Sequence, residues 1–105
     1  MPHSNHLTYE FGPYRFSLAH RALTRDGEII SLTPKAFEIL TRLVVNAGQL
    51  LEKDDLLKEV WPDTFVEEAN LTFTMSVIRK ALGESARTAS YIETVPKHGY
   101  RFTAT

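Results

Sequence analysis

The sequence contains no cysteine among its 105 residues, so neither a disulfide nor a thiolate metal site can form. No apolar run approaches the roughly 18 residues that cross a bilayer, and no signal peptide opens the chain. We therefore expect a cytoplasmic location and no membrane contact by this segment. The nucleophile motif G-x-S-x-G, the zinc motif H-E-x-x-H and a phosphate-cradling glycine loop are absent too. We accordingly expect no enzyme activity and no cofactor.

An overall surplus of positive charge is also missing, because 12 Lys and Arg stand against 13 Asp and Glu and the net charge is −1. This balance by itself argues against a nucleic-acid-binding protein. The distribution of charge along the chain argues for a nucleic-acid-binding protein. Residues 1–78 hold seven basic and eleven acidic residues (−4), whereas residues 79–105 hold five basic and two acidic residues (+3). Phosphate contact depends on such local charge, since screening acts over about 8–10 Å, but ordinary scatter of charges explains the same counts equally well.

The size and composition indicate one compact domain. Hydrophobic residues make up 43% of the chain, which is enough for a single core. Residues 1–8 are polar and predict a flexible N-terminal tail, so we place the domain at residues 9–105. Because His3 and His6 in that tail have no further candidate ligands nearby, we expect no metal site.

Short aromatic and apolar segments predict a small antiparallel sheet of three or four strands over residues 9–33. Gly12 and Pro13 interrupt the first aromatic segment, as expected of a turn or bulge. Asp26 and Gly27 lie between two further short segments and are a strong signal for a two-residue hairpin.

Two helices are predicted to follow the sheet. Thr33 can cap the first helix, Pro34 suits its first turn, and Gly48 closes it. The second helix extends from about Glu52 to Trp61, where Pro62 stops it. The leucines between the two helices predict only a connection.

A third helix, over residues 66–82, has two contrasting faces. Its apolar stripe, at helical spacing, consists of Leu71, Met75, Ile78 and Leu82. The opposite face consists of Ala69, Phe73, Ser76, Val77 and Lys80. This second face is short of charge yet carries two apolar side chains, so we expect a partner to cover it. Gly83 supplies the left-handed residue that ends the helix.

The last segment predicts a β-hairpin with a basic tip. Residues 91–95 read as one strand and residues 100–102 as its partner. Pro96, Lys97, His98 and Gly99 lie between them and form the turn.

Three stretches of this chain, in this order, resemble the OmpR/PhoB-type winged-helix DNA-binding domain, and within that family the CadC/ToxR-like transcriptional regulators. They are LTPKAFEILTRLVVNAGQLLEKDDLLKEVWPD (residues 32–63), VEEANLTFTMSVIRKALGE (residues 66–84) and YIETVPKHGYRF (residues 91–102). They resemble the first two helices, the recognition helix and the closing wing. The resemblance covers about residues 7–104. It implies an α+β fold, a winged helix-turn-helix with an N-terminal antiparallel sheet, a three-helix core and a C-terminal β-hairpin wing.

The resemblance also implies sequence-specific binding of double-stranded DNA by a bacterial-type transcription regulator of one- or two-component signalling. The recognition helix, about residues 66–82, is expected in the major groove, where Phe73, Thr74 and Val77 match the base-contacting positions. Phe73 and Val77 would pack on thymine methyl groups and Thr74 would form a hydrogen bond. The phosphate contacts implied on this helix are those of Asn70, Arg79 and Lys80.

The wing, residues 95–100, is the second contact that the resemblance implies, on phosphate or in the minor groove. Lys97 and His98 are at its tip. Thr94 and Tyr100 would offer hydroxyl groups to the DNA backbone, and Arg101 points to either side of the strand.

Alternative readings remain at this stage. The whole domain is also consistent with a winged helix that binds a protein through the surface of Phe73 and Val77. A second interpretation packs Phe73 against residues 63–66. In some members of the family the corresponding loop contacts RNA polymerase, so the resemblance implies such a contact for the loop from Asp63 to Glu68, although a solvated helix start fits equally well. Family members commonly bind DNA as dimers, and some are membrane-anchored through a region not present in this sequence.

Overall fold

The computed structural model describes residues 8–84 and 91–103. The tail expected at the N-terminus therefore lies almost wholly outside the described residues, as does Arg87 of the basic last quarter.

The described chain begins with a four-stranded antiparallel sheet in which each strand pairs with the next. The strands are β1 (Thr8–Phe11), β2 (Tyr14–Ser17), β3 (Ala22–Arg25) and β4 (Glu28–Ile30). Asp26 and Gly27 have φ angles of +53° and +85° and make the turn between β3 and β4. Arg25 consequently pairs with Glu28, and the predicted two-residue hairpin is confirmed.

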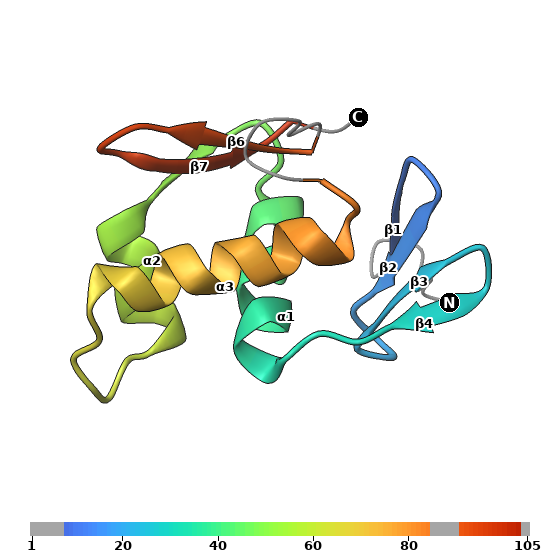
Figure 1. The fold of residues 1–105 in the computed structure, drawn as a ribbon, viewed down its shortest axis with the longest axis horizontal. Coiled ribbons are helices and arrows are strands. Elements are labelled where there is room, and N and C mark those ends of the chain that lie inside the picture. Colours follow the sequence, from blue (N-terminus) through green and yellow to red (C-terminus); the bar gives the residue numbers. More distant parts are fainter. Residues whose placement is uncertain (1–7, 85–90, 104–105) are drawn as a thin grey trace, which may run out of the picture.

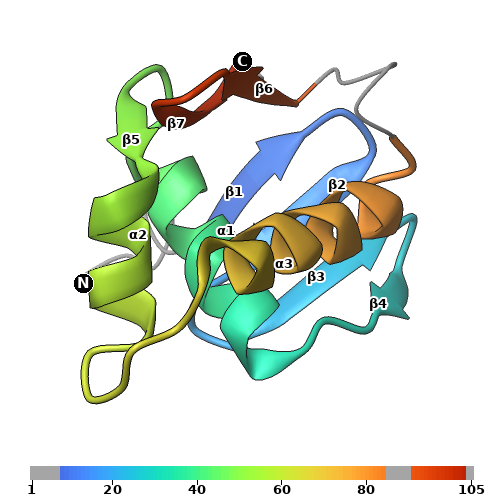
Figure 2. The same ribbon diagram turned by 60° about the vertical axis from the view of Figure 1, so that its left-hand side comes forward.

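Three helices follow: α1 (Pro34–Val45), α2 (Lys53–Val60) and α3 (Glu68–Ala81). The Thr33 hydroxyl accepts a hydrogen bond of 3.2 Å from the Ala36 N–H, which confirms the predicted cap of α1. Figure 1 shows α3 running across α1, from α2 at one end toward the β1–β4 sheet at the other. The view in Figure 2 places this sheet behind α1 and α3.

The C-terminal hairpin belongs to a second sheet of three strands, in the order β5 (Leu50–Glu52), β7 (Gly99–Phe102) and β6 (Ile92–Val95). The predicted hairpin is confirmed, but the connection between the first two helices turns out to contain β5. A strand of three residues is too short to show an alternating pattern, so the sequence gives no signal for it. β5 pairs with β7 and runs directly into α2, so the hairpin is attached to the helical layer through its own sheet.

One apolar core connects both sheets and all three helices. The hydrophobic side chains with no exposed surface are Phe16, Ala36, Ile39, Leu40, Leu43, Val60, Leu71, Ile78 and Ile92. The predicted α3 stripe is buried along its whole length, because Met75 and Leu82 are only 1% and 3% exposed. Burial of one such side chain contributes about 1.5–3 kcal/mol, so this stripe determines how α3 sits on the core.

The turn at the end of the β6–β7 hairpin carries a backbone conformation unusual for its residue. The His98 N–H donates to the Val95 carbonyl at 3.0 Å, with Pro96 and Lys97 between them. Lys97 has a φ of +70°. Proline followed by a positive φ corresponds to a type II turn, whose third position normally holds glycine because side chains disfavour this conformation.

We therefore expect Lys97→Gly to raise the free energy of unfolding by roughly 0.5–1 kcal/mol, since glycine removes a left-handed strain that exceeds its own entropic cost. Urea unfolding of both proteins measures this difference. The matched control is Lys58→Gly on the exposed side of α2, where the same replacement should lower stability by roughly 0.5–1 kcal/mol. Equal losses in the two variants would contradict the strain at Lys97.

Candidate nucleic-acid interface

One side of α3 is open along the helix. Phe73 is 69% exposed, and Val77 beside it is half-buried. The other exposed side chains along this side, between the helix start and its last turn, are Ala69, Asn70, Thr72, Ser76 and Lys80. The prediction that the face opposite the apolar stripe is uncovered is thus confirmed within the described residues.

The end of α3 is held by a complete Schellman motif. Gly83 has a φ of +71°, as predicted for the residue that ends this helix. Its N–H donates to the Lys80 carbonyl at 3.1 Å, and the Glu84 N–H donates to the Arg79 carbonyl at 2.8 Å. The last turn, which carries Arg79 and Lys80, is therefore a rigid part of the helix.

Two residues that the resemblance assigned to DNA contact are buried in the protein instead. Thr74 is 7% exposed, and its hydroxyl donates to the Asn70 carbonyl at 2.8 Å. Arg79 is 8% exposed, and its Nη2 donates to the Ile92 carbonyl at 3.0 Å and to the Thr94 hydroxyl at 2.6 Å. At about 100° per residue, each lies about 70° from the middle of the apolar stripe, on one of its two flanks. Helical geometry alone does not bury Arg79, because Thr72 lies only about 20° away on the same flank and is exposed; the contacts with β6 bury it.

Two residues of the open side had not been selected as contacts from the sequence. Thr72 and Ser76 are exposed, and their hydroxyls donate to the carbonyls of Glu68 (3.3 Å) and Phe73 (2.6 Å). Each oxygen retains acceptor capacity toward a ligand. The available signal was their spacing, because residues four positions apart share one face of a helix, and Ser76 lies three positions from Phe73.

The tip of the hairpin lies beside the N-terminal end of α3. Lys97 and His98 are exposed there, and a hollow of about 90 Å³ is lined by both of them together with Lys53 and Glu68. In Figure 1 the β6–β7 turn projects on the side of α2 and the start of α3. The open side of α3 and the hairpin tip are thus neighbouring parts of one surface.

The three remaining wing residues are engaged within the protein. The Thr94 hydroxyl accepts the hydrogen bond from Arg79, and the Tyr100 ring centroid lies 6.0 Å from the Arg79 guanidinium carbon. Arg101 is half-buried and forms an ion pair of 3.4 Å with Glu93. The sequence did not decide to which side of the strand the Arg101 side chain points; in the structure it points to the side that carries Glu93.

The positive charge of this surface is modest. Lys80 and Lys97 are exposed, whereas the Lys53 ammonium lies 3.2 Å from the Glu68 carboxylate at the start of α3. A second carboxylate, that of Glu67, precedes it. Such a surface attracts phosphate weakly.

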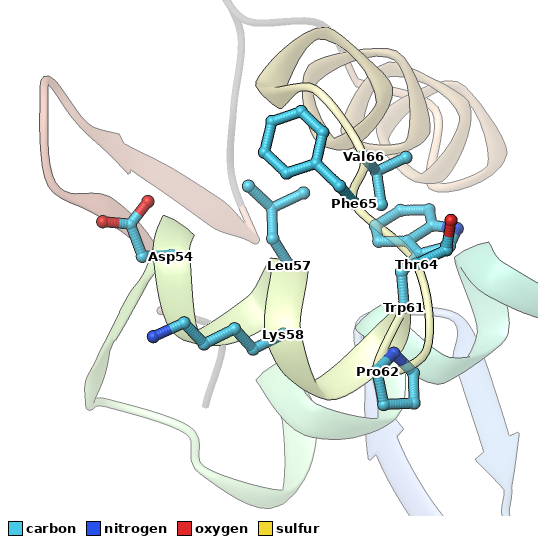
Figure 3. A pocket seen from close by; sticks show the side chains of 8 residues that line it. All are labelled: Asp54, Leu57, Lys58, Trp61, Pro62, Thr64, Phe65 and Val66. Atoms are coloured by element: carbon cyan, nitrogen blue, oxygen red, sulfur yellow. The ribbon is translucent and has the colours of Figure 1, made fainter.

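A separate apolar hollow of about 280 Å³ lies at the loop between α2 and α3 (Figure 3). Leu57, Trp61, Phe65 and Val66 supply its apolar lining, and Phe65 is 90% exposed. Phe73 does not line this hollow, which argues against the alternative that it packs on residues 63–66. Trp61 is half-buried against the core, at the point where α2 meets the loop.

Other kinds of site were sought in the same residues. Residues 8–84 and 91–103 contain no group of three or more histidine or carboxylate side chains placed to hold a metal ion. None of the helices in these ranges has the length and hydropathy needed to span a bilayer.

Comparison with known proteins places this geometry in a family. The family model described as transcriptional regulatory protein, C terminal, matches residues 27–102. The transcriptional activator CadC of Escherichia coli is 31% identical over 80 residues, which are 75% of this chain and 16% of CadC. The chain thus spans about one sixth of the length of that relative.

Two solved structures share the fold. The response regulator DrrB, an OmpR/PhoB homologue of Thermotoga maritima, has a TM-score of 0.86 and 31% identity, over 92% of this chain and 44% of DrrB. The DNA-binding domain of Klebsiella pneumoniae RstA, solved in complex with the RstA box, has a TM-score of 0.80 and 30% identity, over 91% and 96% of the two chains. These relatives confirm the resemblance to CadC-like regulators and the winged-helix architecture. The chain belongs to the family of transcriptional regulatory protein C-terminal domains, the OmpR/PhoB-type winged-helix DNA-binding domains of bacterial transcription regulators, which are not enzymes.

Proposed function

We propose that this domain binds double-stranded DNA sequence-specifically, with α3 in the major groove and the β6–β7 turn against phosphate or the minor groove. The observation that carries the proposal is the open, weakly charged side of α3 with the Lys97 tip beside it. The RstA domain, which shares this architecture, is described in complex with its DNA box. A helix about 10–12 Å across fits a major groove about 12 Å wide.

The side chains in the middle of the open side are the ones that we expect to contact the bases. Phe73 and Val77 present apolar groups suited to thymine methyls, and Thr72 and Ser76 present hydroxyls suited to base edges or phosphates. Lys80 in the last turn and Asn70 in the first are placed to contact the DNA backbone on either side. No exposed arginine lies on the described face of α3, so bidentate guanine recognition is not its mode, and we propose a preference for T-rich sites.

The wing supplies contacts that depend on charge. We assign these to Lys97 and His98, because both are exposed at the turn. Thr94, Tyr100 and Arg101 are engaged with Arg79 and Glu93, so we give them a supporting role. Thr94 is nevertheless exposed and lines the hollow at the hairpin tip. Binding to DNA further implies action in the cytoplasm, where the bacterial chromosome lies.

A second function is favoured by the loop between α2 and α3. We propose that the segment from Asp63 to Glu68 contacts RNA polymerase, with Phe65 as the apolar anchor. The 90% exposure of Phe65 supports this proposal, since an aromatic side chain left in water commonly marks a partner surface. This surface is distinct from the DNA face because Phe73 takes no part in it.

Phe73→Ala should weaken binding to a duplex obtained by random-oligonucleotide selection about 10-fold and relax the thymine preference at one position, since a lost base contact costs about 1–3 kcal/mol. Fluorescence anisotropy measures the affinity, and a repeated selection measures the preference. Phe65→Ala is the matched control, because it removes another exposed ring (90% exposed, against 69% for Phe73) and should leave DNA affinity unchanged. Unchanged binding by Phe73→Ala, or a guanine-dominated selected site, would refute the proposed reading.

Lys97→Gln should weaken binding to selected and random duplexes alike and reduce the slope of log affinity against log salt by about one unit. Lys58→Gln removes a charge from α2, outside the proposed interface, and should leave the slope unchanged. Titrations from low to high salt measure both slopes. If Lys97→Gln keeps the wild-type slope, the hairpin tip is not a phosphate contact. A wild-type domain that binds no duplex even at low salt would favour the protein-contact alternative.

A further inference from the structure

The recognition helix and the wing are separated by a hollow. It has a volume of about 410 Å³, and its walls include Thr72, Met75 and Ser76 of α3 and Tyr100 of the hairpin. Within the described residues, the backbones of α3 and the β6–β7 hairpin make little close approach. Side chains that span this gap therefore decide how far the wing stands from the helix.

The Arg79 side chain spans the gap from the last turn of α3. Its Nη2 reaches both the carbonyl of Ile92 (3.0 Å) and the hydroxyl of Thr94 (2.6 Å), so it contacts two residues of β6. Hydrogen bonds from a charged donor are roughly twice as strong as those between neutral groups. The Nε atom is shielded from solvent, and the side chain as a whole is 8% exposed. A buried guanidinium held in this way is not presented to a DNA phosphate.

A second contact starts from the same end of the helix. The Glu84 N–H closes the Schellman motif on the Arg79 carbonyl at 2.8 Å, and the Glu84 carboxylate accepts a hydrogen bond of 3.0 Å from the Tyr91 N–H. Tyr91 directly precedes β6. The C-terminal turn of α3 thus holds the start of the wing strand by a side chain at each of two positions.

We propose that Arg79 is a positioning residue that sets the distance and orientation of the wing relative to the recognition helix, so that both meet one duplex. The inference rests on the proposed DNA-binding function and assigns Arg79 a part in it without contact to DNA. Thr94 is the acceptor through which Arg79 acts on the strand. Loss of either partner loosens the wing relative to α3, although its pairing with β5 remains, and the duplex must then order it at the cost of affinity.

The first test compares variants that break the contact between Arg79 and Thr94 but keep the charge of the protein with variants that remove a positive charge at position 79 or 80. Arg79→Lys keeps the charge but loses the planar fork, and Thr94→Val loses only the acceptor. Each should weaken binding to the selected duplex about 5- to 20-fold and leave the salt slope at its wild-type value. Lys80→Gln, the neighbouring exposed position, should instead reduce the slope by about one unit. A wild-type affinity in Thr94→Val, or a slope reduced by one unit in Arg79→Gln, would overturn the proposal.

The double variant separates positioning from direct contact at Thr94. If Thr94 acts through Arg79, Arg79→Lys with Thr94→Val should bind about as well as the weaker single variant. Multiplied effects would show that Thr94 contacts the duplex independently and would overturn the proposal. Urea unfolding identifies any variant whose loss arises from unfolding, and Thr94→Val provides the test if Arg79→Lys does not fold.

The last readout requires no DNA. NMR order parameters of residues 95–99 in the free domain should fall in Thr94→Val and stay at wild-type values in Lys80→Gln. Unchanged order parameters in Thr94→Val would overturn the positioning role. Because this measurement is made on the free protein, it remains decisive even if the wild-type domain fails to bind DNA, a result that would refute the proposed function alone.

Discussion

The structure depends on the burial of one stripe of α3 in a core shared by both sheets. Leu71 and Ile78 are fully shielded, and Met75 and Leu82 are nearly so. A helix packed by one stripe must leave the opposite side outward, because side chains three and four positions apart share a face. The exposure of Phe73 is thus a geometric consequence of the burial of its neighbours. The same core that stabilises the domain holds the recognition face in place.

The wing is held by two attachments of different chemistry. On one side, β7 pairs with β5, which leads directly into α2, and the close fit of Gly99 against the β5 backbone leaves no room there for a side chain. On the other side, two side chains at the end of α3 hold the wing: the Arg79 guanidinium contacts β6, and the Glu84 carboxylate accepts a hydrogen bond from Tyr91 just before it. Backbone pairing restrains the hairpin within its sheet, whereas the side-chain contacts restrain its position relative to the helix. The strained turn at Lys97 lies at the tip of the hairpin that these contacts hold.

Most of the fold was predictable because it is encoded locally. Asp26 and Gly27, Thr33 and Gly83 mark the ends of elements by chemistry that acts within a few residues, and all were placed correctly. β5 was not predictable, since its partner β7 is distant in the chain and no hairpin turn marks it, whereas the equally short β4 is marked by the turn that joins it to β3. The same distinction between local and long-range determinants applies to the candidate site. The open side of α3 follows from helical period, but the burial of Arg79 depends on β6, which lies 13 residues away in the chain. A family pattern gives the position of a residue, but it does not show whether a long-range contact within the protein holds its side chain.

The modest charge of the interface has a consequence for how the domain is used. Sequence-independent affinity grows with the number of phosphates neutralised, and few exposed cations face the proposed DNA side in the described residues. One copy would then hold any duplex weakly, and its preference for particular sites would come from the apolar and hydroxyl groups around Phe73. Weak single-site binding becomes strong when two copies occupy adjacent half-sites, because the second contact forms at a high effective concentration. When each copy binds weakly, a wing that is already ordered matters most, because the cost of ordering it would cancel a large part of a small binding free energy.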